Sequence, residues 1–161
     1  MPDPNLPTRT VTTNGVDLDV VDLGSGPPVV LAHGFPELSY SWRHQVPALA
    51  AGGYRVLAPD QRGYGRSTRP DAIEDYDIEH LTNDLLGLLD DIGEERAVFV
   101  GHDWGSMVVW QLALLAPERV AGVVATSVPL LPRGAMRSGC SSASCPTTIE
   151  PQSWPTNTAR S

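Results

Sequence analysis

The pentapeptide Gly101-His-Asp-Trp-Gly105 places an aspartate between two glycines. A G-x-S-x-G pattern between a strand and a helix forms a nucleophile elbow, a strained turn that pushes its central side chain outward. Here the central residue is Asp103. Its carboxylate is ionised at neutral pH and can attack a carbon atom without a base to deprotonate it. The pattern therefore predicts covalent catalysis, with an ester formed on Asp103.

Two backbone amides could stabilise the negative oxygen that develops when such an ester is hydrolysed. The N–H of Trp104 directly follows the nucleophile, and the N–H of Phe35 lies in a second turn, His33-Gly-Phe-Pro36. In enzymes with a nucleophile elbow, amides at these two places form the oxyanion hole. The Phe35-Pro36 dipeptide is also predicted to form a rigid turn with a cis peptide bond.

Alternating strand and helix patterns surround the two turns. Val11 to Val21 alternates apolar and polar residues around Asn14-Gly15, which predicts a β-hairpin. Buried strands are predicted at residues 28–33, 55–58, 97–100 and 120–125, and helices at 42–51, 78–92 and 104–116. This order predicts an α/β domain with a mostly parallel sheet and helices on both faces. The site is then expected at the carboxyl ends of the strands.

Three motifs, in this order, resemble the epoxide hydrolases of the α/β-hydrolase fold family: the turn at 33–36, the loop Asp60-Gln-Arg-Gly-Tyr-Gly-Arg-Ser67 and the pentapeptide at 101–105. The resemblance runs from roughly residue 11 to residue 129. It implies the α/β-hydrolase fold. It also gives turn-forming roles to His33, Gly34, Pro36, Gly101 and Gly105, whereas the loop at 60–67 is expected to be structural.

The resemblance further implies a two-step reaction on a small apolar epoxide. Asp103 would attack a ring carbon to form an alkyl-enzyme ester, and water activated by a histidine would hydrolyse that ester to a vicinal diol. The amides of Phe35 and Trp104 would hold the oxyanion. In such enzymes tyrosines of a helical lid hold the epoxide oxygen, and a late acidic residue and histidine complete the triad. No cofactor and no metal ion are implied.

A catalytic base for this scheme is not found in the sequence. In the α/β-hydrolase order an acid and a histidine follow the nucleophile, yet no histidine follows His102. His33 belongs to a turn, His44 and His80 lie on predicted helices, and His102 should point away from Asp103. We therefore expect a fold that is truncated before its lid and last strands, with impaired or absent turnover.

Residues 131–161 differ in composition from the domain predicted at residues 1–130. From Ser138 onward Ser, Thr and Pro make up more than half of the chain, and Leu, Val, Phe and Tyr are absent. Such a composition predicts a disordered tail. Our hypothesis for its origin is a frameshift or premature stop.

Other functions are compatible with some of these residues. A haloalkane or haloacid dehalogenase also uses an aspartate nucleophile, but the apolar Phe35 and Trp104 favour the epoxide branch. A serine esterase is disfavoured because Ser106 lies a turn deeper in the predicted helix. A non-catalytic remnant or binding module remains open, since a base is missing.

Composition excludes several classes of partner. The net charge of -8 and the pI near 4.8 disfavour binding to nucleic acid. No apolar run is long enough to span a membrane, and the N-terminus has no signal-peptide pattern, so a cytoplasmic location is expected. Cys140 and Cys145 have no histidine nearby and do not predict a metal site. Nothing in the sequence predicts the oligomeric state.

Overall fold

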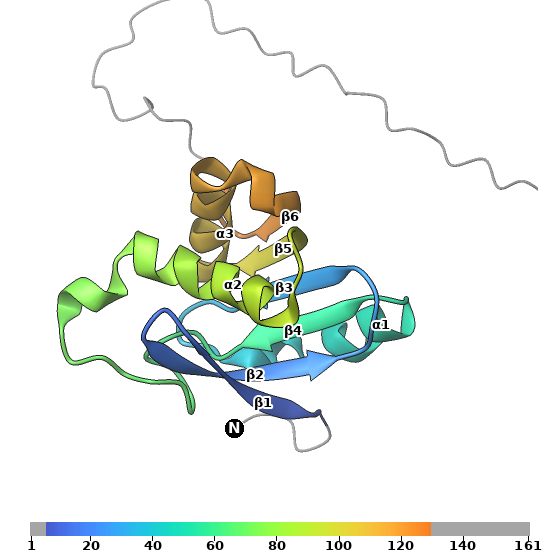
Figure 1. The fold of residues 1–161 in the computed structure, drawn as a ribbon, viewed down its shortest axis with the longest axis horizontal. Helices are drawn as coiled ribbons and strands as arrows, with labels where there is room; N and C mark the ends of the chain where they lie inside the picture. The colour runs from blue at the N-terminus through green and yellow to red at the C-terminus, as the bar shows by residue number, and fades with distance from the viewer. Residues whose placement is uncertain (1–5, 130–161) are drawn as a thin grey trace, which may run out of the picture. The chain divides into compact units, whose positions relative to one another are not determined.

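The computed structural model describes residues 6–129, which form a six-stranded sheet with helices packed on it (Figure 1). The strand order is β1-β2-β4-β3-β5-β6, with β1 at Thr8–Thr13, β2 at Val16–Leu23, β3 at Pro28–Ala32, β4 at Arg55–Pro59, β5 at Ala97–His102 and β6 at Val120–Thr126. β2 pairs antiparallel with both β1 and β4, whereas the pairings among β4, β3, β5 and β6 are parallel. The predicted mostly parallel sheet is confirmed.

The β1-β2 hairpin turns at Asn14 and Gly15, as the sequence predicts. Both residues have positive φ, at 46° and 75°. Two positive values in succession are typical of the type I′ turn that Asn-Gly favours, because its twist matches that of the strands. The register that follows pairs Thr13 with Val16.

The carboxyl ends of three neighbouring parallel strands bring the predicted motifs together. β4, β3 and β5 are adjacent in the sheet, and they lead into Asp60, His33 and Asp103, respectively. β3 is buried along its whole length because it lies between two strands and beneath helices on both faces. The three sequence motifs therefore meet at one edge of the sheet, as expected for this fold class.

The helical elements follow the strands in alternation. They are η1 at Ser39–Trp42, α1 at Gln45–Ala51, η2 at Ile73–Tyr76, α2 at Ile78–Ile92, α3 at Trp104–Leu115 and η3 at Pro117–Arg119. Asp77 caps α2, since its Oδ1 accepts a 2.8 Å hydrogen bond from the N–H of His80. Pro117 ends α3, because a proline cannot continue the helical hydrogen bonds.

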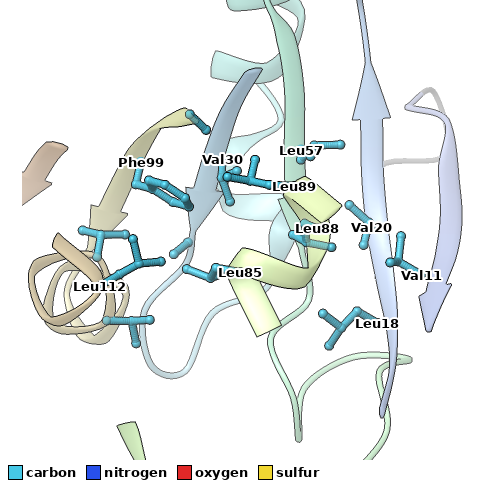
Figure 2. Close-up of a cluster of buried hydrophobic side chains, with 14 of the residues drawn as sticks. Val11, Leu18, Val20, Val30, Leu57, Leu85, Leu88, Leu89, Phe99 and Leu112 are labelled. Carbon is cyan, nitrogen blue, oxygen red and sulfur yellow. The ribbon is translucent and has the colours of Figure 1, made fainter. Parts of the chain in front are cut away.

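The larger hydrophobic core lies between the sheet and helices α2 and α3 (Figure 2). Leu85, Leu88 and Leu89 of α2 pack against Val30 and Phe99 of the central strands, and all five are almost fully buried. This packing holds the α2 and α3 layer on one face of the sheet.

The second hydrophobic core covers the opposite face of the sheet. Val46 of α1 and Trp42 of η1 pack there against Val29, Leu31 and Val56. Helices therefore cover both faces, which confirms that part of the predicted fold.

One detail of the predicted elements is wrong. The helix expected at residues 42–51 starts only at Gln45, because Pro47 has no N–H and its ring would clash with the carbonyl of Arg43 in a longer helix. The tail predicted at 131–161 lies outside the described residues.

Candidate active site

Asp103 lies at a strained turn between β5 and α3. Its backbone has φ 52° and ψ −120°, in a region that residues other than glycine rarely adopt. The flanking glycines allow this turn, since a Cβ at Gly101 would overlap the carbonyl of Gly105, and a Cβ at Gly105 would overlap the carbonyl of Ala32. The local geometry is that of a nucleophile elbow.

Hydrogen bonds from Ser106 fix this turn to the sheet. The Ser106 hydroxyl is fully buried and lies 2.9 Å from the carbonyl oxygen of Gly101 and 2.7 Å from that of Thr126. The N–H of Asp103 donates to the same Thr126 carbonyl at 3.2 Å. Ser106 is thus occupied in holding the elbow.

The N–H of Phe35 donates a 3.0 Å hydrogen bond to Oδ1 of Asp103. This bond, followed by the contribution of the Trp104 backbone N–H, lowers the pKa of Asp103 below that of an ordinary aspartate. The positive charge of a protonated His102 acts in the same direction. Both amides of the predicted oxyanion hole therefore favour the ionised carboxylate.

His33 joins the Phe35 turn to the loop that follows β4. Its ring is fully buried, with Nε2 3.0 Å from the N–H of Gln61 and Nδ1 2.9 Å from the carbonyl of Gly34. Because the Gln61 N–H needs an acceptor, Nε2 is unprotonated and Nδ1–H donates to Gly34. Burial lowers the pKa of His33, which favours this neutral form. The peptide bond between Phe35 and Pro36 is cis, as predicted.

His102 points away from the elbow carboxylate, as predicted. Its Nδ1 lies 3.2 Å from Oε2 of Glu37, and the same oxygen accepts a long, 3.4 Å hydrogen bond from the N–H of Gly34. His102 and Glu37 line a cavity separate from the one beside Phe35 and Trp104. The hydrogen bond between His102 and Glu37 links β5 to the segment that follows the Phe35 turn. It lies outside the cavity that Phe35 and Trp104 line.

A cavity of about 350 Å³ opens next to the elbow. Its wall is mostly apolar and is formed by Gly34, Phe35, Gln61, Arg62, Tyr64, Tyr76, Leu81, Trp104 and Val108. Phe35 and Trp104 are 62 % and 56 % exposed, so large apolar surfaces stand beside the Asp103 carboxylate. Such a cavity suits a small apolar molecule.

A buried ion pair fixes the back of the loop at 60–67. Arg62 donates to both carboxylate oxygens of Asp84 on α2, at 2.7 and 2.6 Å, and both side chains are almost fully buried. Arg62 also donates to the carbonyl of Asp75, and Asn14 of the hairpin turn donates to Asp84. The loop is therefore a structural element, as expected, but it also forms one wall of the cavity.

The structure separates the remaining candidates from the site. His80 lies at the exposed start of α2 with its ring nitrogen 2.8 Å from Asp77, and His44 is exposed beside α1. Among residues 6–129 no histidine forms a hydrogen bond with the carboxylate of Asp103.

The sequence interpretation missed the contribution of Gln61 and Tyr64 to the cavity wall. Both follow β4, which lies next to β3 in the sheet. Their positions directly after a buried strand could be recognised in the sequence. Only the order of the strands in the sheet shows that these positions lie next to the turn after β3.

Within the described part of the chain, no three His, Cys, Asp or Glu side chains gather as potential ligands of a metal ion. None of the helices between Leu6 and Pro129 combines the length and apolar character needed to cross a bilayer.

Comparisons with known proteins agree with this geometry. The family model described as alpha/beta hydrolase fold matches residues 27–140. Epoxide hydrolase A of Mycobacterium tuberculosis is 68% identical over 127 residues, which make up 78% of this chain and 39% of that protein. Bifunctional epoxide hydrolase 2 of Sus scrofa is 52% identical over 118 residues, or 73% of this chain and 21% of that protein. The chain thus spans less than half the length of either relative.

Solved structures give the same result. The crystal structure of Epoxide Hydrolase A from Mycobacterium thermoresistibile aligns with a TM-score of 0.79 and 62% identity, covering 83% of this chain and 42% of that one. An epoxide hydrolase from Vigna radiata aligns with a TM-score of 0.78 and 46% identity, covering 82% and 43%. This chain therefore belongs to the alpha/beta hydrolase fold family, and the relatives named above are epoxide hydrolases.

Proposed function

We propose that this chain carries the nucleophile half of an epoxide hydrolase site, with Asp103 as the nucleophile. One oxygen of the Asp103 carboxylate forms a bond to a ring carbon of a small apolar epoxide. The carbon–oxygen bond of the ring breaks, and its electron pair stays on the oxygen, which takes a proton from water. The product of this step is a hydroxyalkyl ester of Asp103.

The single observation that carries the proposal is the hydrogen bond from the Phe35 N–H to Asp103. It fixes the carboxylate through Oδ1, so that the other carboxylate oxygen is the one that attacks. Because the pKa of Asp103 is lowered, that oxygen carries negative charge at neutral pH. The mostly apolar cavity at Phe35 and Trp104 supports an apolar substrate, and the relatives named above support an epoxide.

Hydrolysis of the ester is the second step of the proposed reaction. Attack by water on the ester carbonyl places negative charge on its oxygen, and the N–H groups of Phe35 and Trp104 would stabilise that charge as an oxyanion hole. Water needs a base for this attack. Since His33 is already engaged with Gln61 and His102 with Glu37, residues 6–129 do not bring a histidine to this task.

The first step therefore gives the cleaner test. The purified chain is incubated with styrene oxide, and its intact mass is measured over time. We expect one covalent adduct on the wild-type chain and on Asp90→Asn, a control that removes an exposed carboxylate of α2. None is expected on Asp103→Asn, whose amide is not a nucleophile. An adduct that persists in Asp103→Asn, or one that is lost in Asp90→Asn, would refute the proposal. A cytoplasmic location remains a prediction from the sequence.

A further inference from the structure

Most polar side-chain groups around the cavity beside Asp103 already have hydrogen-bond partners. Arg62 is held by the carboxylate of Asp84, at 2.7 and 2.6 Å. The side-chain amide of Gln61 donates a 2.6 Å hydrogen bond to the carbonyl of His33. These groups form the cavity wall but are committed to the fold.

The two tyrosines of the cavity wall differ in this respect. The hydroxyl of Tyr76 donates a 2.9 Å hydrogen bond to the carbonyl of Pro70. The hydroxyl of Tyr64 has no hydrogen-bond partner among residues 6–129, although the residue is half-buried and lines the same cavity. A half-buried phenol without a partner can bond to a molecule in the cavity.

The position of Tyr64 is fixed by its surroundings. Its N–H donates to the carbonyl of Gln61 at 2.9 Å, and its own carbonyl accepts from Ser67 at 3.0 Å. Its ring meets the buried ring of His33 edge to face, with the centroids 4.9 Å apart and an interplanar angle of 77°. Little conformational entropy is therefore lost when its hydroxyl binds a ligand.

Electrostatics keep the proton on this hydroxyl. Burial first, and the negative charge of Asp103 second, raise the pKa of Tyr64 above that of an ordinary tyrosine. The phenol is therefore a hydrogen-bond donor at neutral and mildly alkaline pH. The charge of Asp103 also disfavours anions in the cavity, so a ligand oxygen that accepts from Tyr64 is a neutral one.

We propose that the hydroxyl of Tyr64 donates a hydrogen bond to an oxygen of the molecule bound in this cavity. Tyr64 thus selects apolar molecules that carry a neutral oxygen acceptor, and an epoxide belongs to this class. The inference rests on the proposed function, because it assumes that the substrate of Asp103 occupies this cavity. The donor comes from the loop after β4.

The test compares two aromatic probes that differ in one oxygen acceptor, acetophenone and ethylbenzene. Binding of each is measured by nuclear magnetic resonance at the indole of Trp104, for the wild-type chain, Tyr64→Phe and Tyr54→Phe. Tyr64→Phe keeps the ring packed against His33 and removes only the hydroxyl. Tyr54→Phe is the matched control, since it removes the hydroxyl of an exposed tyrosine that does not line the cavity.

We expect Tyr64→Phe to weaken acetophenone binding about threefold to tenfold, the value of one net hydrogen bond. Ethylbenzene binding should stay unchanged, and Tyr54→Phe should change neither affinity. Equal acetophenone affinity in Tyr64→Phe and the wild type would overturn the inference, as would a wild-type chain that binds neither probe.

The rate of adduct formation with styrene oxide separates this inference from the proposed function. If the acetophenone result is as expected but the wild-type chain gains no adduct, the proposed function fails and the role of Tyr64 in binding stands. If an Asp103-dependent adduct forms but Tyr64→Phe changes neither its rate nor the acetophenone affinity, the role of Tyr64 fails and the proposed function stands.

Discussion

The backbone N–H of Phe35 donates a 3.0 Å hydrogen bond to Oδ1 of Asp103, and so joins two turns that lie 68 residues apart in the sequence. The bond forms because β3 and β5 are neighbours and parallel, so that their carboxyl ends meet at one edge of the sheet. It stabilises the charged form of the proposed nucleophile and orients one of its oxygens.

Asp103 should ionise at a lower pH than an ordinary aspartate. The N–H of Phe35, then that of Trp104, stabilises the carboxylate, so the pKa of Asp103 is lowered and the group stays charged as the pH falls. In a titration of its carboxyl carbon by nuclear magnetic resonance, we expect the midpoint to lie below about 3.9, the value for a free aspartate side chain. A midpoint at or above the value measured in the denatured chain would contradict this assignment.

Gly34→Ala should damage the site while the fold remains. An added Cβ at residue 34 would stand 2.6 Å from Cβ and 2.9 Å from Oδ1 of Asp103, so the carboxylate or the Phe35 turn must move. We expect the rate of adduct formation to fall at least about tenfold, because a reaction slows by this factor or more when its nucleophile is displaced from the productive geometry.

The control for this substitution is Gly122→Ala in β6. There an added Cβ meets only a methyl group of Val98, at 3.8 Å, which is ordinary contact. Adduct rates and far-ultraviolet circular dichroism are compared for the two variants. Equal rates in Gly34→Ala and the wild type would show that the close approach of these turns has no bearing on the chemistry.

Asp84→Asn should strongly destabilise the chain. The substitution leaves Arg62 buried without its counter-ion, which costs about 3 to 5 kcal/mol. Asp90→Asn on the same helix removes an exposed partner of Arg119, and such exposed pairs contribute about 0 to 1 kcal/mol. Urea denaturation of both variants gives the comparison. Similar losses in the two would mean that the Arg62–Asp84 pair does not anchor the cavity loop.

The sequence predicted the elements that depend on local patterns. The turn at Asn14-Gly15 and the buried strand β3 each have a local physical cause, and each is confirmed. The elbow at Asp103 was predicted for the same reason, since two glycines can be read directly from the sequence. The start of α1 was missed because the effect of Pro47 on the preceding turn was overlooked.

Features that depend on strand order could not be predicted from the sequence. The place of Tyr64 in the cavity wall follows from β4 lying next to β3, although more than twenty residues separate the two strands. The bond between Arg62 and Asp84 likewise needs α2 to pack over the start of the loop. Such contacts arise from tertiary packing, which local propensity does not specify.

Mapping the adduct within the chain tests the central claim, that Asp103 is the nucleophile, most directly. After incubation with styrene oxide, the chain is digested and its peptides are sequenced by tandem mass spectrometry. The account predicts the added mass on Asp103, as an ester that hydroxylamine removes. Added mass on a histidine, on a cysteine or on no residue would contradict it.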